Sequence, residues 1–69
     1  MADERVWIER IDDAGSGVTY YGYAPSGTAT DEAGWQIKRV TRSGDDVVEV
    51  WAGPLPNQVW DDRGSLTYG

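Results

Sequence analysis

The sequence predicts a small all-β domain, and three features of its pattern point to this fold. Apolar residues come in short runs separated by clusters of Gly, Asp, Ser and Pro, which is typical of strands joined by turns. Several runs alternate apolar and polar residues, as a half-buried strand does. β-branched and aromatic residues dominate the runs. We therefore expect residues 1–69 to form one domain, a small antiparallel meander of four to five strands that makes an open barrel or a two-layer sandwich.

The first strand is expected over residues 5–11 (RVWIERI), where Trp7, Glu9 and Ile11 share one face. The next residues, DDAGSG, end this strand, because aspartate side chains close Asx turns and glycines accept positive φ. The strand therefore presents an aromatic ring and an aliphatic chain on the same side.

The second strand is expected over residues 18–24 (VTYYGYA), with Tyr21 and Tyr23 on one face. Gly22 lies inside it, and a glycine inside a strand indicates a bulge or the close approach of another backbone or a bulky ring. The polar stretch that follows, PSGTATDEAG (residues 25–34), is expected to be a loop. Its TDEA segment can form one helical turn with the threonine as N-cap.

A hairpin is expected between residues 35–40 (WQIKRV) and residues 47–52 (VVEVWA), joined by the glycine-containing loop TRSGDD. Residues 53–58 (GPLPNQ) cannot form a central strand, because proline lacks the N–H that a strand ladder needs. They are expected to be an extended crossing segment. The chain then ends in residues 59–69 (VWDDRGSLTYG), where SLTY is expected to add one short strand.

The predicted core consists of large apolar residues from the hairpin and the end of the chain: Trp35, Ile37, Val48, Val50, Trp60 and Leu66. Several strands carry apolar residues on both faces, which is more than one small core needs, so the second face is expected to meet another protein. Its contact candidates are Trp7, Tyr21, Tyr23 and Trp51. Cysteine and histidine are absent, so oligomerisation or docking on a larger assembly replaces disulfides and zinc as the reinforcement of a small domain.

The stripe formed by Trp7, Tyr21 and Tyr23 allows two interpretations. Such rings can stack against sugars or a proline-rich peptide. The same rings can instead pack on a neighbouring subunit or on the other layer of the fold, because aromatic pairs across strands are ordinary stabilisers of a sheet.

The charge of the chain argues against two classes of partner. Twelve acidic and six basic residues give a net charge of −6, whereas nucleic acid and anionic lipid surfaces attract clustered Lys and Arg. The opening residues, MADERVWIER, are charged where a signal peptide is apolar, and no apolar run reaches the length of a membrane span. We expect a protein made in the cytoplasm that binds neither nucleic acid nor a membrane.

The sequence contains no recognisable reactive set of side chains. Histidine and cysteine are absent, so the commonest general base and the thiol nucleophile are missing, and Lys38 is the only lysine. A calcium loop spaces its ligands at alternate positions, and a glycoside hydrolase needs two acids across a deep cleft. The aspartates here are instead adjacent: Asp12-Asp13, Asp45-Asp46 and Asp61-Asp62. We expect a protein that is not an enzyme and has no metal or cofactor.

The terminal segment is predicted to be a structural clasp. Trp60 and Leu66 are expected to be buried anchors, and Asp61 and Asp62 to accept backbone N–H groups across a tight turn. Arg63 is expected to pair with either aspartate or to lay its guanidinium plane on an indole ring. Such a turn sets the register of SLTY against the sheet.

Several motifs follow one another in a recognisable order: Tyr-x-Gly-x-Ala, a small-residue loop with Thr, Trp-x-Ile-x-Arg-Val, and a closing Trp-Asp-Asp-Arg-x-x-Leu-x-Tyr. The matching positions are Tyr21, Gly22, Tyr23, Ala24, Thr28, Thr30, Trp35, Ile37, Lys38, Arg39, Val40, Trp60, Asp61, Asp62, Arg63, Leu66 and Tyr68. This order resembles that of short proteins encoded among the structural genes of tailed bacteriophages. The segment WAGPLPNQV departs from the family pattern, which usually has an Ala-Asp-Gly turn and a phenylalanine there.

The resemblance implies a virion component without catalysis that is present in multiple copies. It would be a head decoration or cement protein, or a small hinge, neck or fibre-associated protein. Its partners would be other virion proteins and copies of itself, and no catalytic residue carries over. The residues alone leave an alternative open, a small module whose aromatic side chains bind carbohydrate or peptide.

Overall fold

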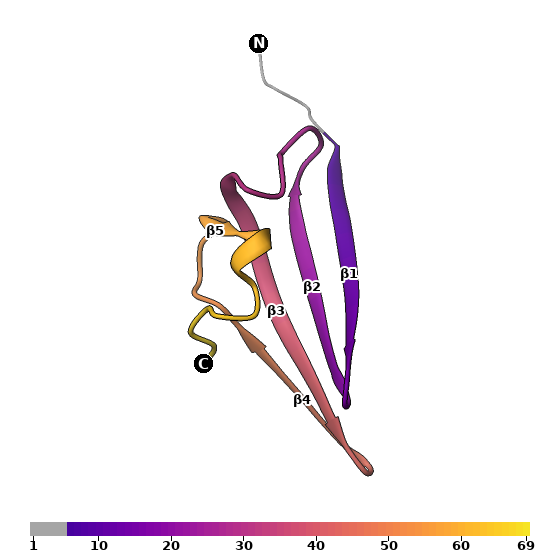
Figure 1. Ribbon diagram of the computed structural model, residues 1–69. Coiled ribbons are helices and arrows are strands. Elements are labelled where there is room, and N and C mark those ends of the chain that lie inside the picture. Colours follow the sequence, from indigo (N-terminus) through magenta and orange to yellow (C-terminus); the bar gives the residue numbers. More distant parts are fainter. Residues whose placement is uncertain (1–5) are drawn as a thin grey trace.

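The computed structural model describes residues 6–69. Its four main strands form one antiparallel sheet and follow each other in chain order (Figure 1). A short fifth strand pairs with the beginning of β3, and a short 3₁₀ helix, η1, follows it. The elements are β1 (Trp7–Gly15), β2 (Val18–Pro25), β3 (Ala33–Ser43), β4 (Asp46–Trp51), β5 (Gln58–Val59) and η1 (Trp60–Asp62). The predicted all-β meander is therefore confirmed, and the sheet is not closed into a barrel.

The second layer of the fold is the C-terminal segment, residues 60–69. It crosses one face of the sheet in front of β3, as the yellow trace in Figure 1 shows. Side chains of this segment pack against residues of β1, β2 and β3. Within residues 6–69, the chain therefore covers one face of the sheet and leaves the other uncovered.

The two hairpins are tighter than the sequence predicted. β1 runs on to Gly15, and the turn to β2 contains only Ser16 and Gly17, both with positive φ (55° and 79°). β3 and β4 are joined through Gly44 and Asp45, and the φ of 62° at Gly44 fits the first central position of a type II′ turn. Most of the residues expected in the two loops therefore extend the strands.

The segment between β2 and β3 is a loop, as predicted, and the helical turn that TDEA can form is absent. The backbone N–H of Ala29 donates to the Glu32 carboxylate at 3.0 Å. The backbone carbonyl of Ala29 accepts the indole N–H of Trp35 at 2.8 Å. Thr28 closes the beginning of the loop through a 2.7 Å hydrogen bond from its hydroxyl to the carbonyl of Pro25. These local bonds hold the loop over the end of the core in place of a helix.

The core is small and lies between the sheet and the C-terminal segment. Its fully or nearly fully buried apolar residues are Ala24, Trp35, Ile37, Ala52 and Trp60. Of the other predicted core residues, Leu66 is partly buried and packs against this core, and Val50 is half-buried. Val48 is 56% exposed, so its prediction as a core residue is wrong. The C-terminal segment meets β4 at Trp51 and leaves the part of the strand near Val48 uncovered.

Candidate functional site: the uncovered face of the sheet

Alternation of side chains along each strand divides the sheet into two faces. The face opposite the C-terminal segment is here called the open face. Its residues are Trp7, Glu9, Ile11, Asp13, Thr19, Tyr21, Tyr23, Pro25, Gln36, Lys38, Val40, Arg42, Val47, Glu49 and Trp51. All four aromatic contact candidates named from the sequence belong to it.

One row of side chains crosses the middle of the open face. The strand registers pair Ile11 with Tyr21, Tyr21 with Lys38, and Lys38 with Trp51. These residues come from β1, β2, β3 and β4 in turn, so each is a direct lateral neighbour of the next. The row joins two aromatic rings, one aliphatic chain and one cation into a continuous strip.

The aromatic residues of the open face contact one another and a central lysine. The rings of Tyr23 and Trp51 lie 6.0 Å apart between centroids, tilted by 45°. The ammonium of Lys38 lies 5.2 Å from the ring centroid of Tyr21 and 5.5 Å from that of Trp51. Both distances are within the range of a cation–π interaction. Lys38 therefore lies between the rings of Tyr21 and Trp51 and contacts both.

Lys38 also forms an ion pair with Glu49, whose carboxylate oxygen lies 2.8 Å from the lysine nitrogen. This hydrogen bond raises the pKa of Lys38 above its usual value, so the ammonium is charged at neutral pH. Burial raises the pKa of Tyr23, and the neighbouring Glu9 raises it further, so the phenol is neutral there. At the middle of the face, the cation is thus compensated by a carboxylate and by two ring faces.

Large apolar side chains are unusually exposed on the open face. Seven large hydrophobic residues are exposed in the described part of the chain, and four of them lie on this face: Trp7 (54%), Ile11 (60%), Val47 (51%) and Trp51 (41%). Single exposed apolar residues are normal on a protein surface, but a contiguous group is typical of an interaction site. The open face has the character of a contact surface.

A shallow hollow of about 430 Å³ adjoins the open face beside Trp51. Its lining is mostly apolar, with two polar side chains from Gln36 and Glu49 at its border. The lining residues are Gln36, Glu49, Val50, Trp51, Gly53, Pro54 and Gly69. Among residues 6–69, no group of three or more His, Cys, Asp or Glu is placed to hold a metal ion. The chemistry that this surface can perform is stacking, apolar contact and hydrogen bonding.

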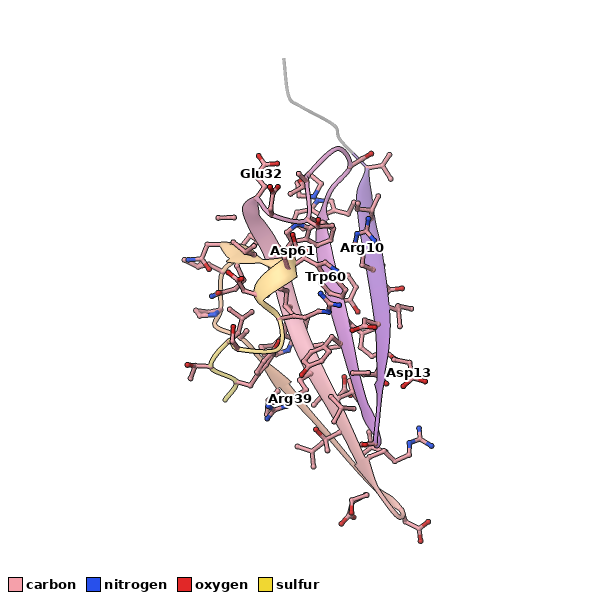
Figure 2. The ribbon with its side chains drawn as sticks, viewed as in Figure 1. Arg10, Asp13, Glu32, Arg39, Trp60 and Asp61 are labelled. Atoms are coloured by element: carbon pink, nitrogen blue, oxygen red, sulfur yellow. The ribbon has the colours of Figure 1, made fainter. Side chains whose placement is uncertain are left out.

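Trp60 anchors the C-terminal segment on the other face of the sheet. Its side chain is 5% exposed, and its ring lies 5.8 Å from that of Trp35 between centroids. Figure 2 shows Trp60 and Asp61 over the sheet at β2 and β3. The six-membered ring of Trp60 occupies the space where a side chain at Gly22 would lie. Of the alternatives offered for this glycine, the close approach of a bulky ring is confirmed.

Arg63 links the C-terminal segment to β1. Its Nε donates to the carboxylate of Asp12 at 3.0 Å, and a second guanidinium N–H donates to the carbonyl of Trp60 at 3.1 Å. The guanidinium carbon also lies 4.7 Å from the ring centroid of Trp60. Stacking on an indole was predicted and is confirmed. The alternative, pairing with Asp61 or Asp62, is not the one the structure shows: the ion pair of Arg63 is with Asp12 on β1.

The two aspartates before Arg63 do not accept backbone N–H groups as predicted, as far as residues 6–69 show. The carboxylate of Asp61 accepts the hydroxyl of Thr30 at 3.4 Å, and its own N–H donates to the Thr30 carbonyl at 3.0 Å. Asp62 acts through its carbonyl, which accepts the N–H of Ser65 at 2.8 Å and its hydroxyl at 3.0 Å. The turn is closed by a serine rather than by the carboxylates.

Tyr68 completes the attachment of the C-terminal segment. Its hydroxyl donates to the carbonyl of Arg63 at 2.7 Å, and its ring lies 6.0 Å from that of Tyr20 and 4.7 Å from the guanidinium carbon of Arg39. Burial, assisted by Tyr20, raises the pKa of Tyr68 to about 12. SLTY bonds within its own segment and is not a strand, so that prediction is wrong; the fifth strand is Gln58–Val59, before Trp60.

Sequence reasoning missed three residues with clear roles. Lys38 and Ile11 belong to the central row of the open face, and Asp12 holds Arg63. Ile11 has the same odd-numbered register as Trp7, and this alternation indicates that both side chains lie on the same face. The pairing of Asp12 with Arg63 joins residues 51 positions apart, and no local pattern indicates it.

Comparisons with protein-family models, with curated proteins and with solved structures found no match. Among residues 6–69, no helix has the length and hydropathy that crossing a membrane requires.

Proposed function

We propose that this chain is a non-catalytic structural protein of a tailed-bacteriophage particle, a head decoration or cement protein or a small neck, hinge or fibre-associated protein. It acts through protein–protein contacts with other virion proteins and with copies of itself. The observation that carries the contact role is the open face. Four aromatic residues and a central compensated cation lie there on a sheet surface that the C-terminal segment does not cover. The phage context is supported by the motif order alone.

The composition of the open face favours a protein partner over a sugar. The open face carries two exposed aliphatic side chains, Ile11 beside Tyr21 and Val47 opposite Arg42. Aliphatic surface gains from burial against another protein. Lys38 is already neutralised by Glu49, so its burial in an interface leaves no unpaired charge.

A second candidate function is recognition of a carbohydrate, and the hollow beside Trp51 favours it. An indole flanked by Gln36 and Glu49 offers stacking and hydrogen bonds to one ligand. This module would work as a monomer, and sugar binding would quench its tryptophan fluorescence. This alternative predicts that the isolated chain binds carbohydrate in the absence of phage particles.

The proposed function is tested by adding the full chain to purified particles of the phage that encodes it, after its native copies are removed. The wild-type chain is expected to co-sediment with the particles, and Trp7→Arg to co-sediment at least about tenfold less, because the substitution places a charge in the contact. Leu55→Arg is the matched control, since Leu55 is 60% exposed and lies outside the open face. A chain that never associates with particles but binds glycans as a monomer contradicts the proposal.

A further inference from the structure

We infer that an extended segment of a partner protein adds as an antiparallel strand to the outer edge of β4 and seats one apolar side chain in the hollow beside Trp51. The outer edge of β4 is the side of this strand that faces away from β3, and Figure 1 shows it at the border of the sheet. The inference rests on the proposed function in one respect, that the partner is a protein. It adds the place, the conformation and the chemistry of the segment that binds.

The hydrogen bonds at the end of β4 show which of its backbone groups point outward. The N–H of Ala52 donates to the carbonyl of Ile37 at 2.8 Å, so the residue that follows β4 points its backbone groups toward β3. These groups alternate in direction along an antiparallel strand. The backbone groups of Val47, Glu49 and Trp51 therefore point away from β3.

The outward backbone groups are free along most of this edge. The Trp51 carbonyl accepts the N–H of Gly69 at 3.2 Å, which confirms its outward direction. β4 is the last strand in the order of the sheet, so no described strand pairs with the N–H and C=O groups of Val47 and Glu49. An extended peptide carries donors and acceptors at the same spacing, so it is the partner that satisfies such an edge.

The other outer edge of the sheet, on β1, carries protections that β4 lacks. Natural sheets protect their edge strands with charged side chains and bulges. β1 has Glu9 and Arg10 in its middle, Asp12 and Asp13 further on, and an irregular register after them. The middle of β4 reads VVEV, and its single carboxylate is already held by Lys38. We therefore assign the partner strand to β4.

The valines of β4 are exposed on both faces of the sheet. Val47, 51% exposed, lies on the open face, whereas Val48, 56% exposed, lies on the opposite face. A partner on the open face covers only the first of them. An added strand places side chains beside both, because residues paired across two strands share a face. The inference therefore accounts for the exposure of Val48, which the open face does not explain.

The hollow beside Trp51 opens at the same edge. Three consecutive residues of β4 line it, Glu49, Val50 and Trp51, although their side chains alternate between the two faces. Its lining is mostly apolar, and its volume of about 430 Å³ accommodates one large side chain. Strand addition takes its affinity from main-chain hydrogen bonds and its specificity from such pockets. The partner residue beside Trp51 is therefore a large apolar one.

The opposite end of the edge is acidic. Asp45 and Asp46 are exposed where β4 begins, and the chain as a whole carries a net charge of −6. Asp46 pairs with Ser43, so its side chain lies on the face opposite to that of Arg42. A basic residue beside Asp46 complements this charge. An antiparallel partner segment thus begins with an apolar residue, continues with β-branched residues and ends with basic ones.

The test uses the full chain and a synthetic peptide of this design, acetyl-Leu-Thr-Thr-Val-Val-Lys-Lys-amide. Its first residue is designed to pair with Trp51 and its sixth with Asp46. We expect a dissociation constant of about 0.1–1 mM, because each hydrogen bond contributes modestly to binding. NMR measures the exchange of single backbone N–H groups with water, and those of Val47 and Glu49 should exchange at least about threefold more slowly at saturating peptide.

The outer edge of β1 is the internal control of this measurement. The carbonyl of Val6 accepts the N–H of Ser26 at 2.6 Å, so by alternation the N–H groups of Glu9 and Ile11 point outward. They belong to a free edge of the same sheet. Their exchange should not change when the peptide is added.

Two N-methylated peptides separate strand addition from contact through side chains alone. Methyl groups on the third and fifth residues remove the N–H groups that face β4, so binding should weaken at least about tenfold. Methyl groups on the fourth and sixth residues lie on the side that faces away from β4, so binding should stay within about threefold of the parent peptide. The two peptides have the same mass and leave the protein unchanged.

A pair of proline variants tests the same edge from the side of the protein. Val47→Pro removes an outward donor and keeps the bonds between β3 and β4, because proline is tolerated where the N–H faces away from the ladder. It should weaken peptide binding at least about tenfold. Glu9→Pro makes the matched change on β1 and should bind as the wild type does. Far-UV circular dichroism checks folding, and the methylated peptides decide if Val47→Pro unfolds.

Three results overturn the inference: no slowing at Val47 and Glu49 up to about 5 mM peptide, equal binding of the two methylated peptides, or equal slowing on β1. None of them touches the proposed function, because binding to particles is measured separately. Conversely, a chain that binds the peptide along β4 but never associates with particles preserves the inference and contradicts the proposed function.

Discussion

Gly22 is the residue at which the sheet admits the Trp60 ring. A Cβ at this position would overlap that ring and lie 3.2 Å from Cε3 of Trp35. We expect Gly22→Ala to lower the free energy of unfolding by about 1–3 kcal/mol, because two buried rings must shift in a small core. Urea denaturation measures the change. Gly64→Ala is the control, since a Cβ there meets nothing within 4 Å, and an equal loss in both variants would contradict the explanation.

Because of Tyr68, the free energy of unfolding is expected to fall at alkaline pH. Its pKa is raised from 10.0 to about 12 by burial, so the folded state holds the phenol proton more tightly than the unfolded state does. The resulting stability is fully present below about pH 10 and is lost as the pH rises toward about 12.

We expect Tyr68→Phe to show a smaller fall in unfolding free energy than the wild type between about pH 8 and about pH 11. At neutral pH the variant should lose about 0.5–1.5 kcal/mol, because the hydrogen bond to the Arg63 carbonyl is missing. Urea midpoints at several pH values measure both effects. If the unfolding free energy falls equally steeply with pH in the two proteins, Tyr68 is not the group that causes the fall.

At the scale of the element, the side chain of Arg63 attaches the C-terminal segment to β1. Arg63 bonds to Asp12 and to the Trp60 carbonyl and stacks on the Trp60 ring, whereas Asp62 bonds through its backbone. The ion pair is partly exposed, so its own contribution is modest.

We therefore expect Arg63→Ala to lower the free energy of unfolding by about 1–3 kcal/mol, combining lost hydrogen bonds with lost stacking. Asp62→Ala should change it by less than about 0.5 kcal/mol, as most surface substitutions do. Thermal or urea unfolding of both variants measures the difference. The two losses being equal, or in the opposite order, would contradict this account of the attachment.

β3 is the central element of the fold, because it pairs with β2, β4 and β5. The existence and order of the four main strands could be predicted from alternation and turn residues. Their lengths could not. Polar stretches such as DDAG and TRS belong to strands, because a neighbouring strand provides hydrogen-bond partners for their backbone groups. Pairing partners, which are distant in the sequence, thus decide where a strand ends.

At the scale of the whole molecule, much of the candidate site could be read from register alone. Trp7, Tyr21, Tyr23 and Trp51 were grouped by position within their strands, and the structure places them on one face. Lys38 at their centre could not be foreseen, because its position between Tyr21 and Trp51 depends on how three strands align. Val48 was misassigned for the same reason, since strand alternation does not say how far the second layer extends.

The sequence by itself determined the class of fold, the order of the strands and which side chains share a face, because these depend on alternation and on residues that favour turns. Only the tertiary structure decided which face is covered. The C-terminal segment lies on the face that offers Gly22 as space for the Trp60 ring and Asp12 as a partner for Arg63. Trp7 and Trp51 on the opposite face stay exposed, because the described chain has no second segment to cover that face.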